Sequence, residues 1–197
     1  MQSPFPLIPR YDTLLSEMPD NSSLIRVQNI LQDTLRIFDT HIGWGLFTVE
    51  KKIKPITFGN GTQLGISDLR KLPNGTCIFT PRQLVTRDPE LNADDENLLG
   101  IYVALGSVPL RSIVAIKVGQ TNDNPTYNSE VGTAAHELAH RLNLQHCDTS
   151  SWCVMNARQD PAALGNAMSP ALNSAKNPFC QDHTEELRQR YSARPSK

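Results

Sequence analysis

Three of the five histidines in this 197-residue chain lie within the segment HELAHRLNLQH, at His136, His140 and His146. His136 and His140 are four residues apart, so on a helix both imidazoles leave the same face, one turn apart. Two nitrogens at this separation can chelate one Zn²⁺ ion, and Glu137 then lies beside the metal, where it can exchange a proton. The spacing predicts a metal site with an adjacent carboxylate base.

The third histidine makes a chance occurrence of the motif much rarer. A helix with two incidental surface histidines would explain HExxH alone. HExxH followed by a histidine six residues later arises by accident in about one sequence in ten thousand of this composition. For His146 to reach the same metal, the helix must end and the backbone must bend sharply. Asn143 stands at that position, and Asn is second to Gly in tolerating the left-handed conformation.

Three neutral nitrogen ligands with a fourth position open to water are typical of a catalytic zinc. Zinc lowers the pKa of its bound water and polarises a substrate carbonyl, while Glu137 accepts the water proton and passes it to the leaving amine. The predicted reaction is peptide-bond hydrolysis, with Glu137 as general base.

The four cysteines suggest a second metal site. Cys147, Cys153 and Cys180 together with His183 make a Cys₃His set, which suits a closed, tetrahedral structural zinc. The alternative is a Cys147–Cys153 disulfide with Cys180 free. Cys77 lies in the apolar run TCIFT, where we expect a small buried side chain.

The surrounding pattern predicts an α+β or α/β fold. Apolar residues at helical spacing predict amphipathic helices over 21–42 and 129–142. Strands are expected over 44–53, 55–59, 76–80, 98–105 and 111–119. Residues 1–12 contain three prolines and predict an extended arm, residues 86–97 an acidic loop, and the C-terminal part an irregular lobe. We expect one domain over 1–197, with an upper subdomain of about 22–146 and a smaller one of about 147–190.

Charge and hydropathy narrow the function classes. Nineteen basic and twenty acidic residues leave a net charge of −1, without the like-charge runs of nucleic-acid or membrane-surface binders. The basic tail of Arg188, Arg190, Arg194 and Lys197 is expected to be solvated. No apolar run reaches the roughly 18 residues of a membrane helix. Thiolate zinc ligands and the lack of a visible leader favour the cytoplasm.

The zinc motif resembles the metzincin signature HExxHxxGxxH, with Asn143 in place of the usual Gly. More specifically, HELAHRLNLQHCDTSSWCVMN followed by NPFCQDH resembles the archaemetzincins over roughly 130–190. The resemblance implies a twisted mixed sheet with an amphipathic helix and an active-site helix, an edge strand that binds substrate, and two zinc ions, one catalytic and one structural. It also implies that Met155 forms an apolar floor under the ligands, with Met168 as the rival methionine.

The chain departs from the archaemetzincin pattern at three places. Five residues separate Cys147 from Cys153 where the family has four, and His183 replaces the last cysteine. An insertion is expected around 161–174. Besides an active peptidase acting on peptides or proteins, two alternatives stay open: a silent, zinc-stabilised peptide-binding or regulatory protein, and a purely structural zinc module.

Overall fold

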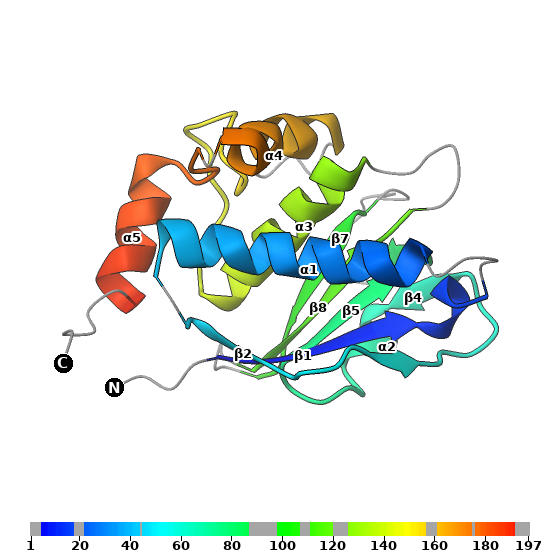
Figure 1. The fold of residues 1–197 in the computed structure, drawn as a ribbon. Coiled ribbons are helices and arrows are strands. Elements are labelled where there is room, and N and C mark those ends of the chain that lie inside the picture. Colours follow the sequence, from blue (N-terminus) through cyan, green and yellow to red (C-terminus); the bar gives the residue numbers. More distant parts are fainter. Residues whose placement is uncertain are drawn as a thin grey trace.

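The computed structural model describes residues 5–17, 22–43, 45–86, 98–106, 111–119, 126–156, 161–174 and 176–191. Its strands are β1 (Phe5–Asp12), β2 (Phe47–Val49), β3 (Lys54–Ile56), β4 (Gln63–Gly65), β5 (Thr76–Thr80), β6 (Gln83–Val85), β7 (Gly100–Ala104) and β8 (Ser112–Lys117). Its helices are a short 3-10 turn (Thr13–Leu15), α1 (Ser22–His41), α2 (Ile66–Leu69), α3 (Tyr127–Arg141), α4 (Pro161–Ser174) and α5 (Gln181–Tyr191). The fold is therefore mixed α/β, as predicted (Figure 1).

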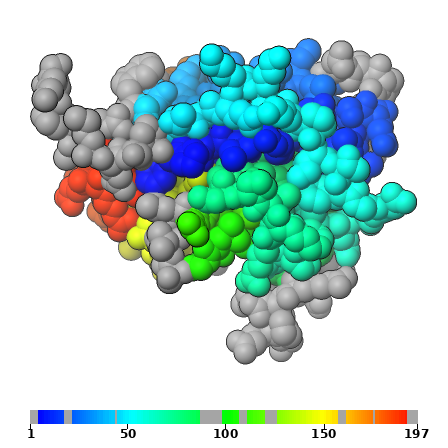
Figure 2. Space-filling view, turned by 90° about the horizontal axis from the view of Figure 1, so that it is seen from below, coloured from blue at the N-terminus to red at the C-terminus, as the bar shows by residue number. Residues whose placement is uncertain are grey.

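The main sheet has the strand order β2-β1-β5-β8-β7, with β3 also paired to β1. All pairs are parallel except the last, because β7 runs antiparallel to β8 with Gly100 opposite Ile116. All five residues of β5 are buried, as expected for an apolar strand with neighbours on both sides. In Figure 2 the blue band of β1 separates the cyan residues that follow α1 from the green part of the sheet.

The first strand corrects the sequence-based expectation of a proline-rich arm. Residues Phe5–Asp12 are extended, but they form a strand with pairs on both of its edges. Proline removes a backbone donor and therefore argues against an interior strand. Here non-proline groups carry the ladder: Phe5 N donates to Leu46 O at 2.8 Å and Ile8 N donates to Gly75 O at 2.9 Å.

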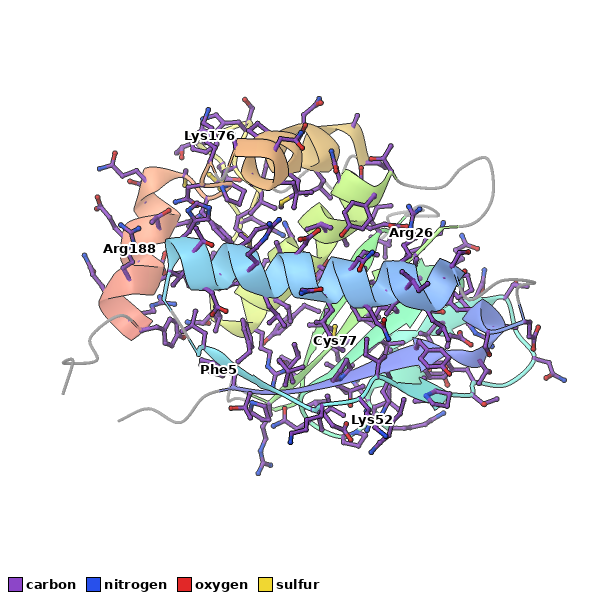
Figure 3. All side chains as sticks on the ribbon, viewed as in Figure 1. Phe5, Arg26, Lys52, Cys77, Lys176 and Arg188 are labelled. Atoms are coloured by element: carbon purple, nitrogen blue, oxygen red, sulfur yellow. The ribbon has the colours of Figure 1, made fainter. Side chains whose placement is uncertain are left out.

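Helices α1 and α3 pack on one face of the main sheet, and α4 packs on α3 (Figure 1). The larger apolar cluster joins this face to all four long helices, and Cys77 of β5 lies within it, fully buried as predicted (Figure 3). A smaller cluster on the opposite face joins β7 and β8 to the segment that contains α2, β4 and β6. The sheet thus has a packed core on both faces, and α3 is held firmly against one of them.

The sequence predicts an irregular C-terminal part, but the structure has two helices there, α4 and α5. The expected insertion coincides with α4, which runs from Pro161 to Ser174. Of the basic tail that was expected to be solvated, Arg188 and Arg190 belong to α5, and Arg188 Nε donates to His41 O at 3.0 Å (Figure 3). Arg194 and Lys197 lie outside the described residues. Short helices with weak periodicity are hard to recognise because their packing partners lie far away in the sequence.

Two further expectations concern the acidic loop and membrane-spanning helices. Residues 87–97 of the predicted acidic loop lie outside the described residues. Among the helices that are described, none combines the length and the apolar composition needed to cross a membrane.

Candidate functional site

Helix α3 places His136 and His140 side by side. The helix begins after Thr126, whose side-chain oxygen accepts a hydrogen bond from Ser129 N. Nε2 of His140 lies 3.0 Å from Nε2 of His136 and 3.1 Å from Nε2 of His146. The three nitrogens that the sequence predicted to share a metal ion therefore converge on one point.

A tight turn after α3 brings His146 back to the helix. Asn143 has φ 64°, so it adopts the left-handed conformation that the sequence predicted at this position. Asn143 N donates to His140 O at 2.8 Å, and Leu144 N donates to Ala139 O at 3.1 Å. This pair of bonds is the Schellman motif, which ends a helix and reverses the chain. Asn143 thus performs the structural role of the usual glycine.

Two of the imidazoles are oriented by backbone carbonyls. His136 Nδ1 lies 2.7 Å from Val154 O, and His140 Nδ1 lies 2.8 Å from Leu144 O. A carbonyl has no proton to give, so Nδ1 is the donor in both contacts and each neutral ring keeps its lone pair on Nε2. The lone pairs therefore face one another, an arrangement that a bound cation would satisfy.

Burial also keeps these rings neutral. Burial, and to a lesser extent the neighbouring His140, lowers the pKa of His136 to about 3. Burial likewise lowers the pKa of His140. Zinc binds neutral imidazole, so these two ligands need not lose a proton at neutral pH when the metal binds. The donor set fits zinc in both chemistry and protonation state.

Glu137 lies between α3 and the edge strand β7. Glu137 is buried, with 1% of its surface exposed. The carboxylate packs against the backbone of Gly100, since a Cβ atom added there would lie 2.6 Å from Cγ and 2.6 Å from Oε1 of Glu137. The predicted base is therefore held next to the strand at the edge of the sheet.

The second predicted ligand set is also assembled. The ligand atoms of Cys147, Cys153, Cys180 and His183 all lie within 4.8 Å of one another. Sγ of Cys147 and Sγ of Cys180 are 3.8 Å apart. Two sulfurs bound at 2.3 Å to one tetrahedral ion are separated by about 3.8 Å. Cys153 Sγ lies 3.4 Å from His183 Nδ1 and accepts a hydrogen bond from Cys180 N at 3.3 Å.

The disulfide alternative is wrong for this structure, in which all four cysteines are free. A disulfide needs sulfur atoms about 2.05 Å apart. Cys153 Sγ instead faces His183. A Cys147–Cys153 bridge would leave the Cys-x-x-His pair of Cys180 and His183 without a role.

The two methionines occupy different places. Met155 is fully buried and follows Val154, the residue that holds His136; its carbonyl accepts a hydrogen bond from Cys147 N at 2.7 Å. Met168 is also buried, but it belongs to α4, on the far side of α3 from the sheet. Met155 therefore directly follows the residue that holds His136, whereas Met168 lies in a separate helix.

Three residues that contact the histidine helix or its turn, Tyr102, Arg190 and Tyr191, were not predicted from the sequence to do so. Tyr102 of β7 lies over His140, with ring centroids 5.8 Å apart. From α5, Arg190 Nη1 donates to Asn143 O and the Tyr191 hydroxyl donates to Leu142 O, each at 3.0 Å. These contacts join segments about 40 to 50 residues apart, so no local pattern could reveal them.

Comparison with known proteins finds similarity to this chain only among solved structures, at the level of the fold. Neither a protein-family model nor a curated protein matches the chain. Among solved structures, it is similar to an archaemetzincin from Methanopyrus kandleri, with a TM-score of 0.61, 19% identity and coverage of 94% of each chain. It is also similar to a zinc-dependent peptidase from Methanocorpusculum labreanum, with a TM-score of 0.55, 14% identity and coverage of 91% of this chain and 99% of that one. The chain therefore has an archaemetzincin-like fold.

Proposed function

We propose that the protein is a zinc peptidase that hydrolyses peptide bonds, with His136, His140 and His146 as ligands of the catalytic zinc. The observation that carries this proposal is the convergence of three Nε2 atoms, at 3.0 and 3.1 Å, beside the buried carboxylate of Glu137. A structural site would be closed by a fourth protein ligand. Among the described residues, the histidine set contains three.

The chemistry is divided between the metal and Glu137. When bound, zinc supplies an acidified water and an electrophilic contact for the substrate carbonyl. Glu137 accepts the proton from that water and returns it to the leaving amine. Its burial between α3 and β7 keeps the carboxylate in one place and limits competing solvent.

Strand β7 is the proposed docking edge for the substrate. It is the last strand of the main sheet, and among the described residues its outer edge carries no partner strand. An isolated bridge between Leu84 and Leu98 lies just before it. An extended peptide could add to this edge through backbone hydrogen bonds, directly above the histidines. Tyr102 would then lie beside the bound peptide.

The Cys₃His set is proposed to hold a second, structural zinc ion. Its four ligands are buried and leave no position for substrate. Cys147 and Cys153 lie in the segment between His146 and Met155, Cys180 directly precedes α5, and His183 lies in the first turn of α5. A metal ion here would join the C-terminal helices to the catalytic turn.

Two features would support the silent-protein alternative, Asn143 in the turn and an occluded cleft, and the structure bears on the first. A disturbed turn would have moved His146 away from the other ligands. The left-handed φ of 64° and the two bonds of the Schellman motif remove that support. Glu137 would also have no use in a purely structural module.

The test combines metal content with turnover. We expect two zinc ions per chain by elemental mass spectrometry and cleavage of members of a broad peptide library. Glu137→Ala should lower kcat by roughly 10²- to 10⁴-fold without loss of zinc. The matched control is Glu185→Ala, because Glu185 is an exposed glutamate on α5. Full zinc loading without cleavage of any peptide would support the silent alternative.

A further inference from the structure

Gly100 makes an unusually close approach to the catalytic helix. An added Cβ would lie 2.6 Å from both Cγ and Oε1 of Glu137 and 2.7 Å from Cγ2 of Thr133. Contacts below 3.0 Å are essentially never seen for real Cβ atoms, so any side chain here must displace a neighbour. Gly100 is not in a left-handed conformation, so its requirement is one of space rather than backbone torsion.

The strand cannot easily retreat from the helix. Gly100 is paired with Ile116 of β8, and Lys117 N donates to Leu99 O at 2.7 Å. On the opposite face, Ile101 and Val103 are buried in the smaller apolar cluster. Moving β7 outward would break ladder bonds and unpack that cluster.

The helix cannot retreat either. Thr133 Oγ1 donates to Ser129 O at 2.8 Å, which holds its methyl group in place. Behind α3, Gly132 is close to α4, because a Cβ there would lie 3.1 Å from Leu164 O. The most mobile neighbour of Gly100 is therefore the end of the Glu137 side chain.

We propose that Gly100 is a positioning residue for Glu137: the missing side chain in β7 creates the space in which the carboxylate is held. This inference rests on the proposed function for its effect on turnover, but the contact itself does not. A methyl group at position 100 would push the carboxylate away from its place while leaving the three histidine nitrogens unchanged.

The first arm of the test is kinetic. Gly100→Ala should lower kcat by roughly tenfold or more, in the range of a misplaced general base. KM should change less than about twofold, because the backbone groups of β7 remain available to an extended peptide. Zinc content should stay at the wild-type value. The matched control is Gly65→Ala in β4, where the nearest contact of an added Cβ is an ordinary 3.7 Å.

The second arm is a double-mutant cycle on Tm of the zinc-loaded protein. Gly100→Ala should lower Tm by roughly 3–10 °C in the wild-type background. In the Glu137→Ala background the same substitution should lower Tm by less than half as much, since two of the three clashing atoms are gone. When Thr133→Ser is added to Gly100→Ala, it removes Cγ2, the third clashing atom, but keeps the hydroxyl. This double variant should recover part of the lost Tm but none of the lost kcat.

The outcomes are distinct. Coupling in the cycle together with a selective loss of kcat supports the proposal. Equal Tm losses in both backgrounds, or coupling with an unchanged kcat, overturn it. If the wild-type protein cleaves no peptide, the proposed function fails while the Tm cycle alone decides whether Gly100 positions Glu137.

Discussion

The imidazole of His136 donates from Nδ1 to the carbonyl oxygen of Val154 at 2.7 Å. Val154 stands between Cys153, a member of the Cys₃His set, and Met155. Val154 N in turn donates to Pro178 O at 2.9 Å, shortly before Cys180. A single backbone segment therefore connects the two candidate metal sites, and His146 and Cys147 connect them a second time through adjacent positions in the chain.

This connection predicts that the second site supports the first. Cys153→Ala should raise the Kd for zinc at the histidine site by roughly 10- to 100-fold, because the Val154 carbonyl loses its anchor. Competition with a chromophoric chelator measures this Kd. Cys77→Ala is the matched control, since Cys77 is a buried cysteine outside both sets. An unchanged Kd after Cys153→Ala would show that the two sites are independent.

The ligand swap at His183 gives a complementary prediction. His183→Cys would restore the four-cysteine set of the resembled family, and thiolate and imidazole are both ordinary zinc ligands. We expect zinc content to remain at two ions per chain, whereas His183→Ala should lose one. Elemental mass spectrometry distinguishes these results. Retention of both ions by His183→Ala would remove His183 from the ligand set.

The turn at Asn143 predicts a stability difference. Asn143→Ala places an ordinary side chain at φ 64° and should lower the free energy of unfolding by about 1 kcal/mol. Asn143→Gly should change it by less than about 0.5 kcal/mol, because glycine adopts this conformation freely. Urea unfolding of the metal-free protein measures both. Equal losses would mean that the asparagine side chain, rather than its backbone, stabilises the turn.

The buried histidine predicts acid sensitivity of the metal-free protein. Burial lowers the pKa of His136 from 6.5 to about 3. The unfolded chain therefore binds a proton that the folded protein rejects, so stability falls as pH decreases from about 6.5 toward 3. The slope from this group is at most about 1.4 kcal/mol per pH unit. Tm measured between pH 7 and 4 should fall less steeply for His136→Gln than for the wild type; parallel curves would contradict the assignment.

The ion pair between Asp12 and Arg82 predicts a large effect far from the site. Arg82 Nε lies 2.6 Å from Asp12 Oδ2, and both side chains are almost fully buried. Asp12→Ala leaves the guanidinium without its carboxylate and should cost about 3–5 kcal/mol in urea unfolding. The exposed pair of Lys71 and Asp68 gives the control, since Asp68→Ala should cost less than about 1 kcal/mol. Similar losses for the two variants would contradict this.

The features that depend on local spacing can be predicted from the sequence alone. The four-residue separation of His136 and His140 places them on one helical face, and Asn143 is the residue in the linking turn that accepts a left-handed conformation. The buried strands β5 and β8 are likewise evident from their apolar runs. In each case, the residues that matter are close in the chain, so periodicity and backbone preference are sufficient.

The way in which distant segments meet follows from the packing of the folded chain. The sequence did not reveal that the proline-rich start of the chain is an interior strand, because its hydrogen-bonding partners lie in β2, β3 and β5. Nor did it reveal that Gly100 makes room for Glu137, or that the carbonyl of Val154 orients His136. A missing side chain and a backbone carbonyl leave no mark in a residue pattern. Their roles arise from packing, which brings together atoms that the chain order keeps apart.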